Sequence, residues 1–489
     1  MAMLGKRRPR RERSGVSGLQ GRQAPQGGLG TPDASDDDAR DEQSRGVTVE
    51  RLAHDGRGLA HSPDGKTLFI EGALPGERVV AAVHRTRKRF DEAHLREVLE
   101  ASPERVTPPC EYFARCGGCD LQHLALSAQR RHKARVLVDL LARQGVEVPG
   151  EPERLAGSPD GYRRRARLGV KVDAQGSVHL GFRARHSHRL VDIADCTILV
   201  PALNALLVPL QQQLDSLAAP RQVGHLELLD SDQGRVVIVR QLRVLDDDRA
   251  RWLAFAAAHG LHLAWLAGRE SPSLTWLTPA PSLSVRVPAA QGEVTLGFAP
   301  GDFLQANAEV NRQMVTTALS WLDGLDGAVL LDLFAGVGNF SLPLASAGAR
   351  VVAVEGNPAM VERLAENARV NSPEQGLDVT ARQADLDDVE AVMRLLAEAA
   401  PDSVVLDPPR GGAEAVCRAL VNRPVARVLY ISCDPATLAR DAACLVHGGY
   451  RVKRAAVADM FVHTSHLESM LLLEGPWIGQ QRQGASPDG

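Results

Sequence analysis

Four short apolar segments, each followed at once by a glycine-rich, acidic or cysteine-containing loop, mark the C-terminal part of the chain. They are Ala328–Leu333, Val351–Val354, Ser403–Leu406 and Val428–Ile431. Runs of this length and composition, bounded by turn signals, predict buried strands of a parallel sheet. Ligands of open α/β sheets bind at the carboxyl ends of the strands. The loops that follow these segments are therefore expected to hold the reactive groups.

Three of these loops favour a nucleoside cofactor. The loop Phe334–Phe340 (FAGVGNF) has glycines that let the backbone pass close to a ligand, and Glu355 follows about 20 residues later, where an acid meets ribose hydroxyls. The third glycine of the dinucleotide fingerprint is absent, which favours S-adenosylmethionine (SAM). Asp385 follows a further strand-like stretch and could reach an adenine edge. Asp407-Pro408-Pro409 is typical of methyltransferases that act on a nitrogen or a nucleic-acid base.

The fourth loop contains a cysteine. Cys433 follows the apolar strand directly, and Thr437–Asp441 reads as the first turns of a helix. A helix N-terminus favours a thiolate, so this position suits a nucleophile. A buried structural cysteine is the alternative interpretation.

Four other cysteines are spaced as possible ligands: Cys110, Cys116, Cys119 and Cys196. Gly117 and Gly118 would let the backbone fold closely around a metal or cluster. A redox pair and a structural zinc site are alternatives, but one x5 gap, one x2 gap and a distant fourth cysteine favour an iron–sulfur cluster over zinc. The chain has seven cysteines, an odd number that indicates a reducing cytosol.

Length and patterning predict several domains in this chain of 489 residues. Residues 1–46 read as a disordered tail whose basic half is either solvated or in contact with nucleic acid. Short alternating segments from Val47 to Glu100 predict a small β-barrel. This stretch resembles a TRAM domain, an RNA-binding barrel, and its basic residues would contact phosphates; they are Arg85, Arg87, Lys88 and Arg89.

The middle of the chain predicts one amphipathic helix and a basic sheet face. The helix is expected at Ala125–Gln144, and Tyr162–Val172 alternates as a half-buried strand with arginines on one face. Together with Leu180–Asp192, this strand could present a surface to RNA. A solvated sheet face is the alternative. The net charge of −3 says little about partners, and no apolar run reaches the length of a membrane span.

With these residues in place, the chain resembles the RNA uracil-5-methyltransferases, and most closely the RlmD (RumA) branch, which methylates one uridine of 23S ribosomal RNA. The motifs that carry the resemblance are Asp302–Asn307 (DFLQAN), Leu331–Phe340 (LDLFAGVGNF), Glu355-Gly356, Leu406–Arg410 (LDPPR), Ile431–Asp441 (ISCDPATLARD) and Asp459–Met470 (DMFVHTSHLESM). Asp434 stands where Asn is common in the family. The match extends from about Val47 to Leu473.

The resemblance implies a role for each matching residue. Cys433 would be the nucleophile and Glu468 the base. SAM would be contacted by Gln305, Phe334, Asn339, Glu355, Asp385 and Asp407, and a [4Fe–4S] cluster would be bound by Cys110, Cys116, Cys119 and Cys196. His463 and His466 are interpreted as structural or RNA-facing.

The implied fold is a multidomain α/β protein. It would comprise a disordered tail (1–46), a TRAM-like barrel of OB type (47–101), a central α+β domain with an iron–sulfur cluster and an RNA-binding surface (102–300), a Rossmann-like SAM-dependent methyltransferase domain (301–475) and a second disordered tail (476–489). The implied partner is 23S rRNA, with no membrane and no obligate protein partner, and a cytoplasmic monomer is expected.

The implied chemistry explains the cysteine. Uracil C5 is a weak nucleophile, and a thiolate that adds to C6 moves electron density to C5, which then takes the methyl group. A base must remove the C5 proton. The alternatives are a tRNA uracil-C5 methyltransferase, an iron–sulfur radical RNA methylthiotransferase, an amino-methyltransferase that uses Asp407-Pro408-Pro409, and an inactive RNA-binding relative. The barrel and the cysteine pattern favour the ribosomal branch.

Overall fold

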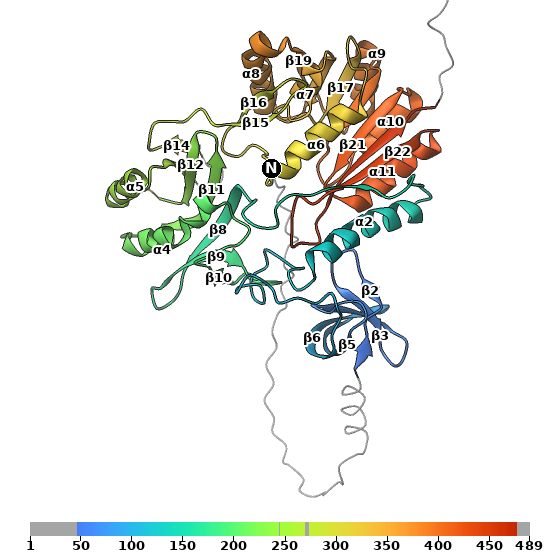
Figure 1. The fold of residues 1–489 in the computed structure, drawn as a ribbon. Helices are drawn as coiled ribbons and strands as arrows, with labels where there is room; N and C mark the ends of the chain where they lie inside the picture. The colour runs from blue at the N-terminus through green and yellow to red at the C-terminus, as the bar shows by residue number, and fades with distance from the viewer. Residues whose placement is uncertain (1–45, 244, 269–272, 477–489) are drawn as a thin grey trace, which may run out of the picture. The chain divides into compact units, whose positions relative to one another are not determined.

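The computed structural model describes residues 46–243, 245–268 and 273–476. The predicted disordered tails, 1–46 and 476–489, fall almost wholly outside these ranges. The described residues from Gly46 onward form one compact unit by contact. Within this unit the described strands form three large sheets and one hairpin (Figure 1).

The first sheet is the predicted barrel region. Six strands hydrogen-bond in the order β1-β5-β6-β4-β3-β2 around a small apolar core that includes Val49, Ile70 and Val79. The strands are β1 (Val47–Thr48), β2 (Arg51–Leu52), β3 (Gly58–His61), β4 (Thr67–Glu71), β5 (Arg78–Thr86) and β6 (Phe90–Glu100). Gly56 and Gly65, each at a predicted turn, have positive φ angles that glycine tolerates best.

The second sheet follows helix α2 (Leu126–Arg143) and has seven strands in the order β10-β9-β8-β11-β12-β13-β14. The strands are β8 (Arg165–Val172), β9 (Val178–Arg183), β10 (Leu190–Asp192), β11 (Val223–Ser231), β12 (Gly234–Gln241), β13 (His262–Ala267) and β14 (Ser273–Trp276). Helices α3 (Pro201–Asn204), α4 (Leu207–Ser216) and α5 (Asp246–His259), with the 3-10 turn Pro220–Gln222, lie among them. In β8, Ala166, Leu168 and Val170 are buried as the alternation predicts.

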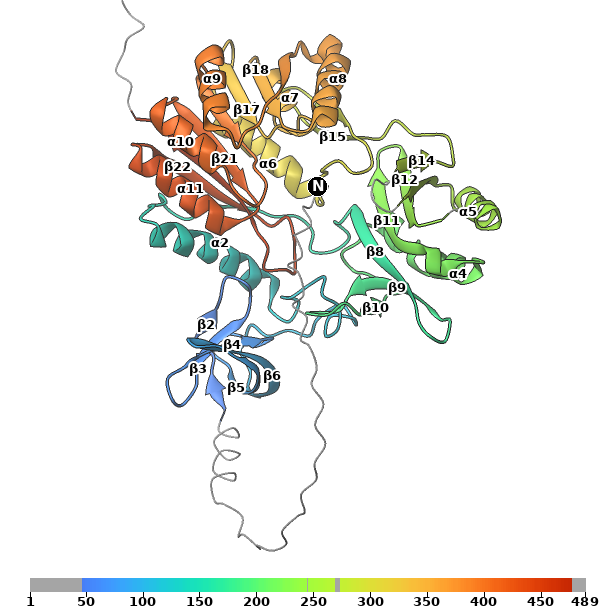
Figure 2. The ribbon, with the colours of Figure 1, turned by 180° about the vertical axis from the view of Figure 1, so that it is seen from behind.

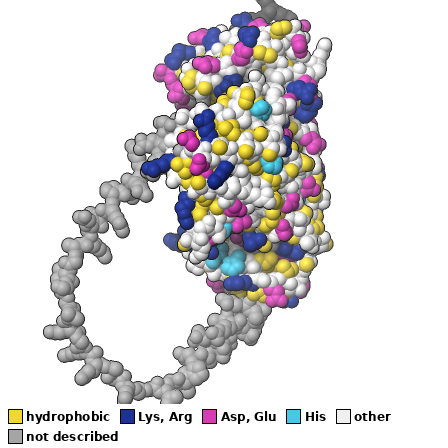
Figure 3. All heavy atoms as spheres, turned by 90° about the vertical axis from the view of Figure 1, so that its left-hand side faces the viewer, with side chains coloured by type: hydrophobic (Ala, Val, Ile, Leu, Met, Phe, Trp, Pro, Cys, Tyr) yellow, Lys and Arg dark blue, Asp and Glu magenta, His cyan; other side chains and the backbone are white. Residues whose placement is uncertain are grey.

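The basic face of β8 is only partly free for RNA. Arg165 donates to Glu227 at 2.8 Å and to the Asp302 carbonyl at 2.6 Å, so this arginine joins the sheet to the segment that follows it. Arg167 and Lys171 are exposed. Figure 3 shows basic and acidic side chains interspersed over one face of the molecule, which agrees with the nearly balanced charge of the chain.

The third sheet confirms the Rossmann-like prediction. Its order is β19-β18-β17-β20-β21-β23-β22-β7, and the first five strands are mutually parallel. The strands are β7 (Glu153–Leu155), β17 (Val329–Leu333), β18 (Arg350–Glu355), β19 (Asp378–Gln383), β20 (Ser403–Leu406), β21 (Arg427–Ser432), β22 (Arg451–Ala458) and β23 (Glu468–Glu474). The hairpin β15 (Ser284–Pro288) and β16 (Glu293–Gly297) precedes it.

Helices cover both faces of this sheet (Figures 1 and 2). One apolar core joins it to α2, α9 (Val389–Ala399), α10 (Glu414–Asn422) and α11 (Pro435–His447). The other joins it to α6 (Ala308–Trp321), α7 (Ser341–Ser346) and α8 (Pro358–Gln375). Alternate residues of each strand enter opposite cores, as Leu330 and Leu331 of β17 do. The predicted domain boundaries stay predictions, because contacts do not divide the described residues from Gly46 onward any further.

The prediction of a central domain built around an iron–sulfur cluster is wrong. Among the described residues, no group of three or more His, Cys, Asp or Glu side chains is arranged to hold a metal ion. The four thiols do lie near one another, since burial and then the charges of the other three raise the pKa of Cys119 to about 12. The spacing of the four cysteines indicated that their thiols would lie close together, but spacing in the sequence does not determine the geometry that metal ligands need.

Gly117 has another explanation in the structure. Its N–H donates to the Arg183 carbonyl at 2.9 Å, and a β-carbon on residue 117 would lie 2.9 Å from that oxygen. Close approach of strand β9 therefore accounts for this glycine without a cluster. Separately, no helix within the described ranges is long and apolar enough to cross a membrane.

Candidate active site

The sheet brings most of the predicted site residues to one edge. Strands β17 to β21 run parallel, so Phe334, Glu355, Asp407 and Cys433 all lie at their carboxyl ends. Strand β23 is antiparallel to β21, with Ser432 opposite Ser469. Its first residue, Glu468, therefore lies at the same edge as Cys433, 35 positions away in sequence.

Cys433 is a partly buried residue between β21 and α11. Asp434 caps the helix, because its carboxylate accepts from Ala436 N at 2.9 Å and Thr437 N at 3.2 Å, as an Asn at this position would. The helix does not make the thiol acidic. Burial, followed by the charges of Glu468 and Asp407, raises the Cys433 pKa to about 11, which corrects the expectation of a favoured thiolate.

Glu468 is 4% exposed, and its pKa is raised to about 8. Burial is the main cause and the Asp407 charge adds to it, whereas Arg410 acts in the opposite direction. A carboxyl group with this pKa is close to the operating pH, which is the property of an efficient general base or acid.

Asp407 and Arg410 complete the electrostatics of this edge. Asp407 follows β20, and burial raises its pKa to about 7. Arg410, three residues later, is exposed and lowers the pKa of both Cys433 and Glu468. Sequence reasoning assigned no role to Arg410, although its place directly after the two prolines fixes it at this edge.

The glycine loop after β17 is tightly held. Phe334 adopts a left-handed backbone with φ of 65°, a conformation that costs a non-glycine residue energy and recurs at ligand sites. Glu355 accepts from Gly336 N at 3.1 Å and from Asn357 N at 2.9 Å. Asn339 exchanges two hydrogen bonds with Asn311 of α6, at 2.8 and 3.0 Å.

Of the two remaining predicted residues, Asp385 lies at the same carboxyl edge because β19 is parallel to β18, whereas Gln305 lies outside the sheet. Gln305 lies before α6, outside the sheet, and is 8% exposed. Asp385 follows β19, is exposed, and accepts from Asp387 N at 3.0 Å.

Asp332 is a buried acid near this edge that the sequence analysis did not single out. It lies within β17, is 1% exposed, and accepts from the Ser341 hydroxyl, while its Oδ1 has no hydrogen-bond partner among the described residues. Burial raises its pKa to about 7, with the charges of Asp407 and Glu355 as further causes. An acid inside the predicted buried strand Ala328–Leu333 was the available signal.

Comparisons with known proteins identify the family. A model described as tRNA (Uracil-5-)-methyltransferase matches residues 127–475, and a TRAM domain model matches residues 43–95. A protein of Halomonas elongata named 23S rRNA (uracil(1939)-C(5))-methyltransferase RlmD is 62% identical, with 100% of both chains covered. The chain belongs to the RlmD-type RNA uracil-C5 methyltransferases.

Further relatives support this RlmD-type assignment. The protein of the same name from Chromohalobacter salexigens is 55% identical over 97% of this chain and 96% of the relative, and that of Pseudomonas putida is 44% identical over 88% and 93%. The solved structure of Pyrococcus abyssi tRNA (uracil-54, C5)-methyltransferase, in complex with S-adenosyl-L-homocysteine, has a TM-score of 0.68 and 22% identity, covering 87% of this chain and 99% of that chain. This last likeness shows the shared fold.

The chain is therefore a SAM-dependent RNA uracil-C5 methyltransferase, as its resemblance implied. The TRAM prediction and the parallel sheet are confirmed, and the radical methylthiotransferase alternative is excluded by the family.

Proposed function

We propose that this enzyme methylates C5 of uridine 1939 of 23S rRNA, with Cys433 as nucleophile and Glu468 as base. The uridine number comes from the names of its RlmD relatives. The observation that supports the two roles is the pairing of β21 with β23, which brings a thiol and a carboxyl group from distant segments to one sheet edge. A ribosomal substrate also implies that the enzyme acts in the cytoplasm.

The residues at this edge fit SAM. The buried, unpaired Oδ1 of Asp332 is an acceptor that awaits a donor such as the ammonium of a bound amino acid group. Glu355 lies where ribose hydroxyls meet an acid, and Phe334 holds a strained turn beside it. We propose that SAM contacts these residues together with Gln305, Asn339, Asp385 and Asp407. When bound, SAM supplies an electrophilic methyl group.

The chain's own groups then account for the remaining steps. Cys433 gives its thiol proton to solvent, the thiolate sulfur bonds to uracil C6, and the ring becomes an enolate whose electron density at C5 is directed to the methyl group. Glu468 takes the C5 proton, the C–H electron pair restores the C5–C6 double bond, and Cys433 leaves as a thiolate. Arg410 favours the anionic form of both residues, which suits a site where negative charge develops.

The test uses tritiated SAM and unmodified 23S rRNA with the parent, Cys433→Ala and Glu468→Gln. We expect 5-methyluridine from the parent, none from Cys433→Ala, and a denaturation-stable protein–RNA adduct that accumulates in Glu468→Gln. Cys444→Ala, in the helix that follows the nucleophile, is the control and should keep parental activity. Methylation by Cys433→Ala would refute the covalent mechanism and favour direct transfer at the Asp407-Pro408-Pro409 edge.

A further inference from the structure

Helix α2 contacts the segment that leads into Glu468, which is residues 459–467 between β22 and β23. We infer that Gln129 and Lys133 of α2, with Asp459, are positioning residues that set the direction of the Glu468 carboxyl group. The inference rests on the proposed role of Glu468 as the base. It assigns a catalytic consequence to a helix that lies about 330 residues before the base in sequence.

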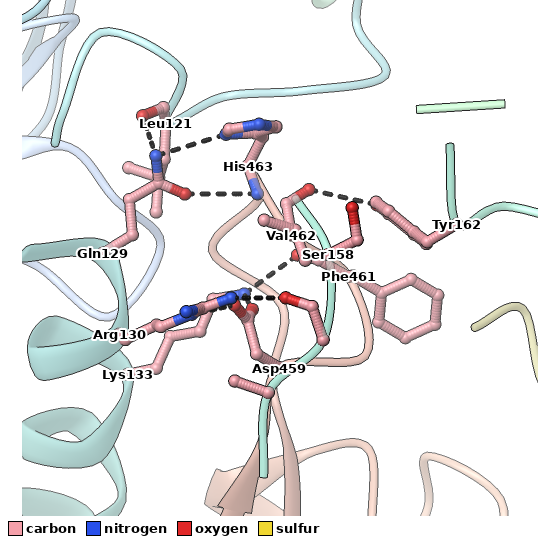
Figure 4. A network of polar contacts seen from close by, with 12 residues as sticks. Leu121, Gln129, Arg130, Lys133, Ser158, Tyr162, Asp459, Phe461, Val462 and His463 are labelled. Carbon is pink, nitrogen blue, oxygen red and sulfur yellow. Dashed lines mark hydrogen bonds and ion pairs between the residues drawn. The ribbon is translucent and has the colours of Figure 1, made fainter. Parts of the chain in front are cut away.

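The first contact is a buried ion pair at the start of the segment (Figure 4). Lys133 has no exposed surface, and its ammonium donates to Asp459 Oδ1 at 2.7 Å and to the Phe461 carbonyl at 2.8 Å. Arg130, one turn earlier, donates to Asp459 Oδ2 at 3.0 Å and to the Gly157 carbonyl at 2.7 Å. Since lysine is rarely buried without a specific partner, this pair fixes where the segment leaves β22.

The second contact fixes the middle of the segment. The Gln129 carbonyl oxygen accepts from His463 N at 3.2 Å, while its amide donates to the Leu121 and Leu124 carbonyls at 3.0 and 2.7 Å. The His463 carbonyl accepts in turn from Leu121 N at 2.9 Å. His463 has a left-handed backbone with φ of 67°, which a non-glycine residue keeps only when its surroundings impose it. The histidine is therefore structural, one of the two roles that the sequence analysis gave it.

Two more contacts leave the segment little freedom between these points. The Tyr162 hydroxyl donates to the Val462 carbonyl at 3.1 Å, as Figure 4 also shows. Asp120 accepts from Ser465 N at 2.7 Å and from the Ser465 hydroxyl at 2.9 Å. Ser465 is three residues before Glu468, so the loop is held almost to the residue at which the strand begins.

The same helix also contacts the side of the sheet that carries the nucleophile. Leu137 and Leu141 of α2 share an apolar core with Leu438 and Leu445 of α11, the helix that begins directly after Cys433. Helix α2 thus contacts the segment before the base and the helix after the nucleophile. The polar residues of α2 face the segment before Glu468, and its leucines face α11. A change of the polar contacts alone should therefore move Glu468 and leave Cys433 in place.

This division predicts which chemical step is affected. Bond formation at C6 depends on Cys433, whereas removal of the C5 proton and release of Cys433 depend on the direction of Glu468. A displacement of about 1 Å can slow a step by up to about 100-fold. We expect adduct release to be slowed about 10-fold, with adduct formation within about twofold of the parent.

The experiment follows single turnovers with excess enzyme, measuring the formation and the decay of the denaturation-stable adduct. The variants are Gln129→Met, which removes the donors and the acceptor at similar size, and Lys133→Met/Asp459→Asn, which removes both buried charges and leaves the partly exposed Arg130 with its Gly157 contact. Arg143→Ala, an exposed residue at the end of the same helix, is the control and should match the parent.

Slow release with near-parental formation in both test variants supports the inference. Release at the parental rate, or an equal slowing of formation and release, overturns it, because the contacts would then be unimportant or merely structural. Glu468→Gln separates this inference from the proposed function. If that variant accumulates no adduct, the base assignment itself fails; if it does accumulate adduct while the test variants release normally, only the positioning role fails.

Discussion

Replacing Glu468 by glutamine should stabilise the protein while it abolishes turnover, and the stabilisation should grow with pH. The buried carboxyl group has a pKa of about 8 in the folded protein, against an ordinary value of 4.5. Below pH 4.5 the group is protonated in both states and contributes no difference. As pH rises from 4.5 toward 8, the unfolded chain ionises freely and the folded chain does not, so the parent loses stability. Glutamine carries no charge at any of these values and escapes this loss.

The magnitude follows from the two pKa values. At 1.36 kcal/mol per pKa unit, the parent's deficit is about 1 kcal/mol at pH 5, about 3 kcal/mol at pH 7 and about 5 kcal/mol at pH 9. Asp332 and Asp407 also have raised pKa values, but both are present in parent and variant and largely cancel in the difference. Exchanging an acid for an amide also changes the free energy of unfolding by an amount that does not depend on pH. Only the change of the variant-minus-parent difference with pH is therefore attributed to the ionisation of Glu468.

Urea unfolding at pH 5, 7 and 9, followed by circular dichroism, measures this difference. Glu474→Gln is the matched control, because Glu474 ends the same strand, is exposed and has only a 3.6 Å surface ion pair with Lys453. The control should differ from the parent by less than about 1 kcal/mol at every pH. A Glu468→Gln advantage that stays constant from pH 5 to pH 9 would refute the argument that burial raises the pKa of this carboxyl group.

Three further predictions concern the surroundings of these groups. Asp332→Asn should weaken SAM binding in equilibrium dialysis by roughly 10- to 100-fold, the loss of a charged hydrogen bond, and unchanged binding would contradict the role of its free oxygen. Lys133→Met should lower the free energy of unfolding by roughly 1.5–3 kcal/mol in urea unfolding, because Asp459 loses the Lys133 hydrogen bond but keeps Arg130 as a partner at 3.0 Å, and no loss would contradict this role of the buried pair. Arg410→Met should raise the pKa of the Cys433 thiol and slow its alkylation by iodoacetamide at pH 8, measured on the Cys433 peptide by mass spectrometry; equal rates would show that Arg410 does not act on the thiol.

The strand ends were predictable because their signal is local. Ser403–Leu406 was expected as a strand and is β20, and the buried run Val428–Ile431 lies within β21. A parallel strand covered on both faces is apolar throughout, so its end is marked by the first polar or glycine residue. That rule placed Glu355, Asp407 and Cys433 without any knowledge of strand order.

The errors come from properties that depend on burial and on distant neighbours. The dipole of α11 predicted an acidic thiol at Cys433, but burial raises its pKa, and so do the charges of Glu468 and Asp407, at the ends of two other strands. The burial of Lys133 could not be predicted, because the amphipathic pattern of Ala125–Gln144 cannot show that Asp459 lies opposite this lysine. The cysteine spacing indicated proximity of thiols, but it could not show their relative orientation or that Gly117 serves a strand contact.

The direction of one strand explains why the base needs support from outside the sheet. If β23 ran parallel to β21, Glu468 would lie at the opposite edge, roughly 17 Å from Cys433 for the six paired residues. The antiparallel direction puts the first residue of β23 at the catalytic edge. Strand pairing fixes the chain after this residue but not the chain before it. The chain before Glu468 is the loop from β22, and strand pairing does not determine the conformation of this loop. Gln129, Lys133 and Asp459 supply that missing constraint, so the geometry of the base is set jointly by the sheet and by helix α2.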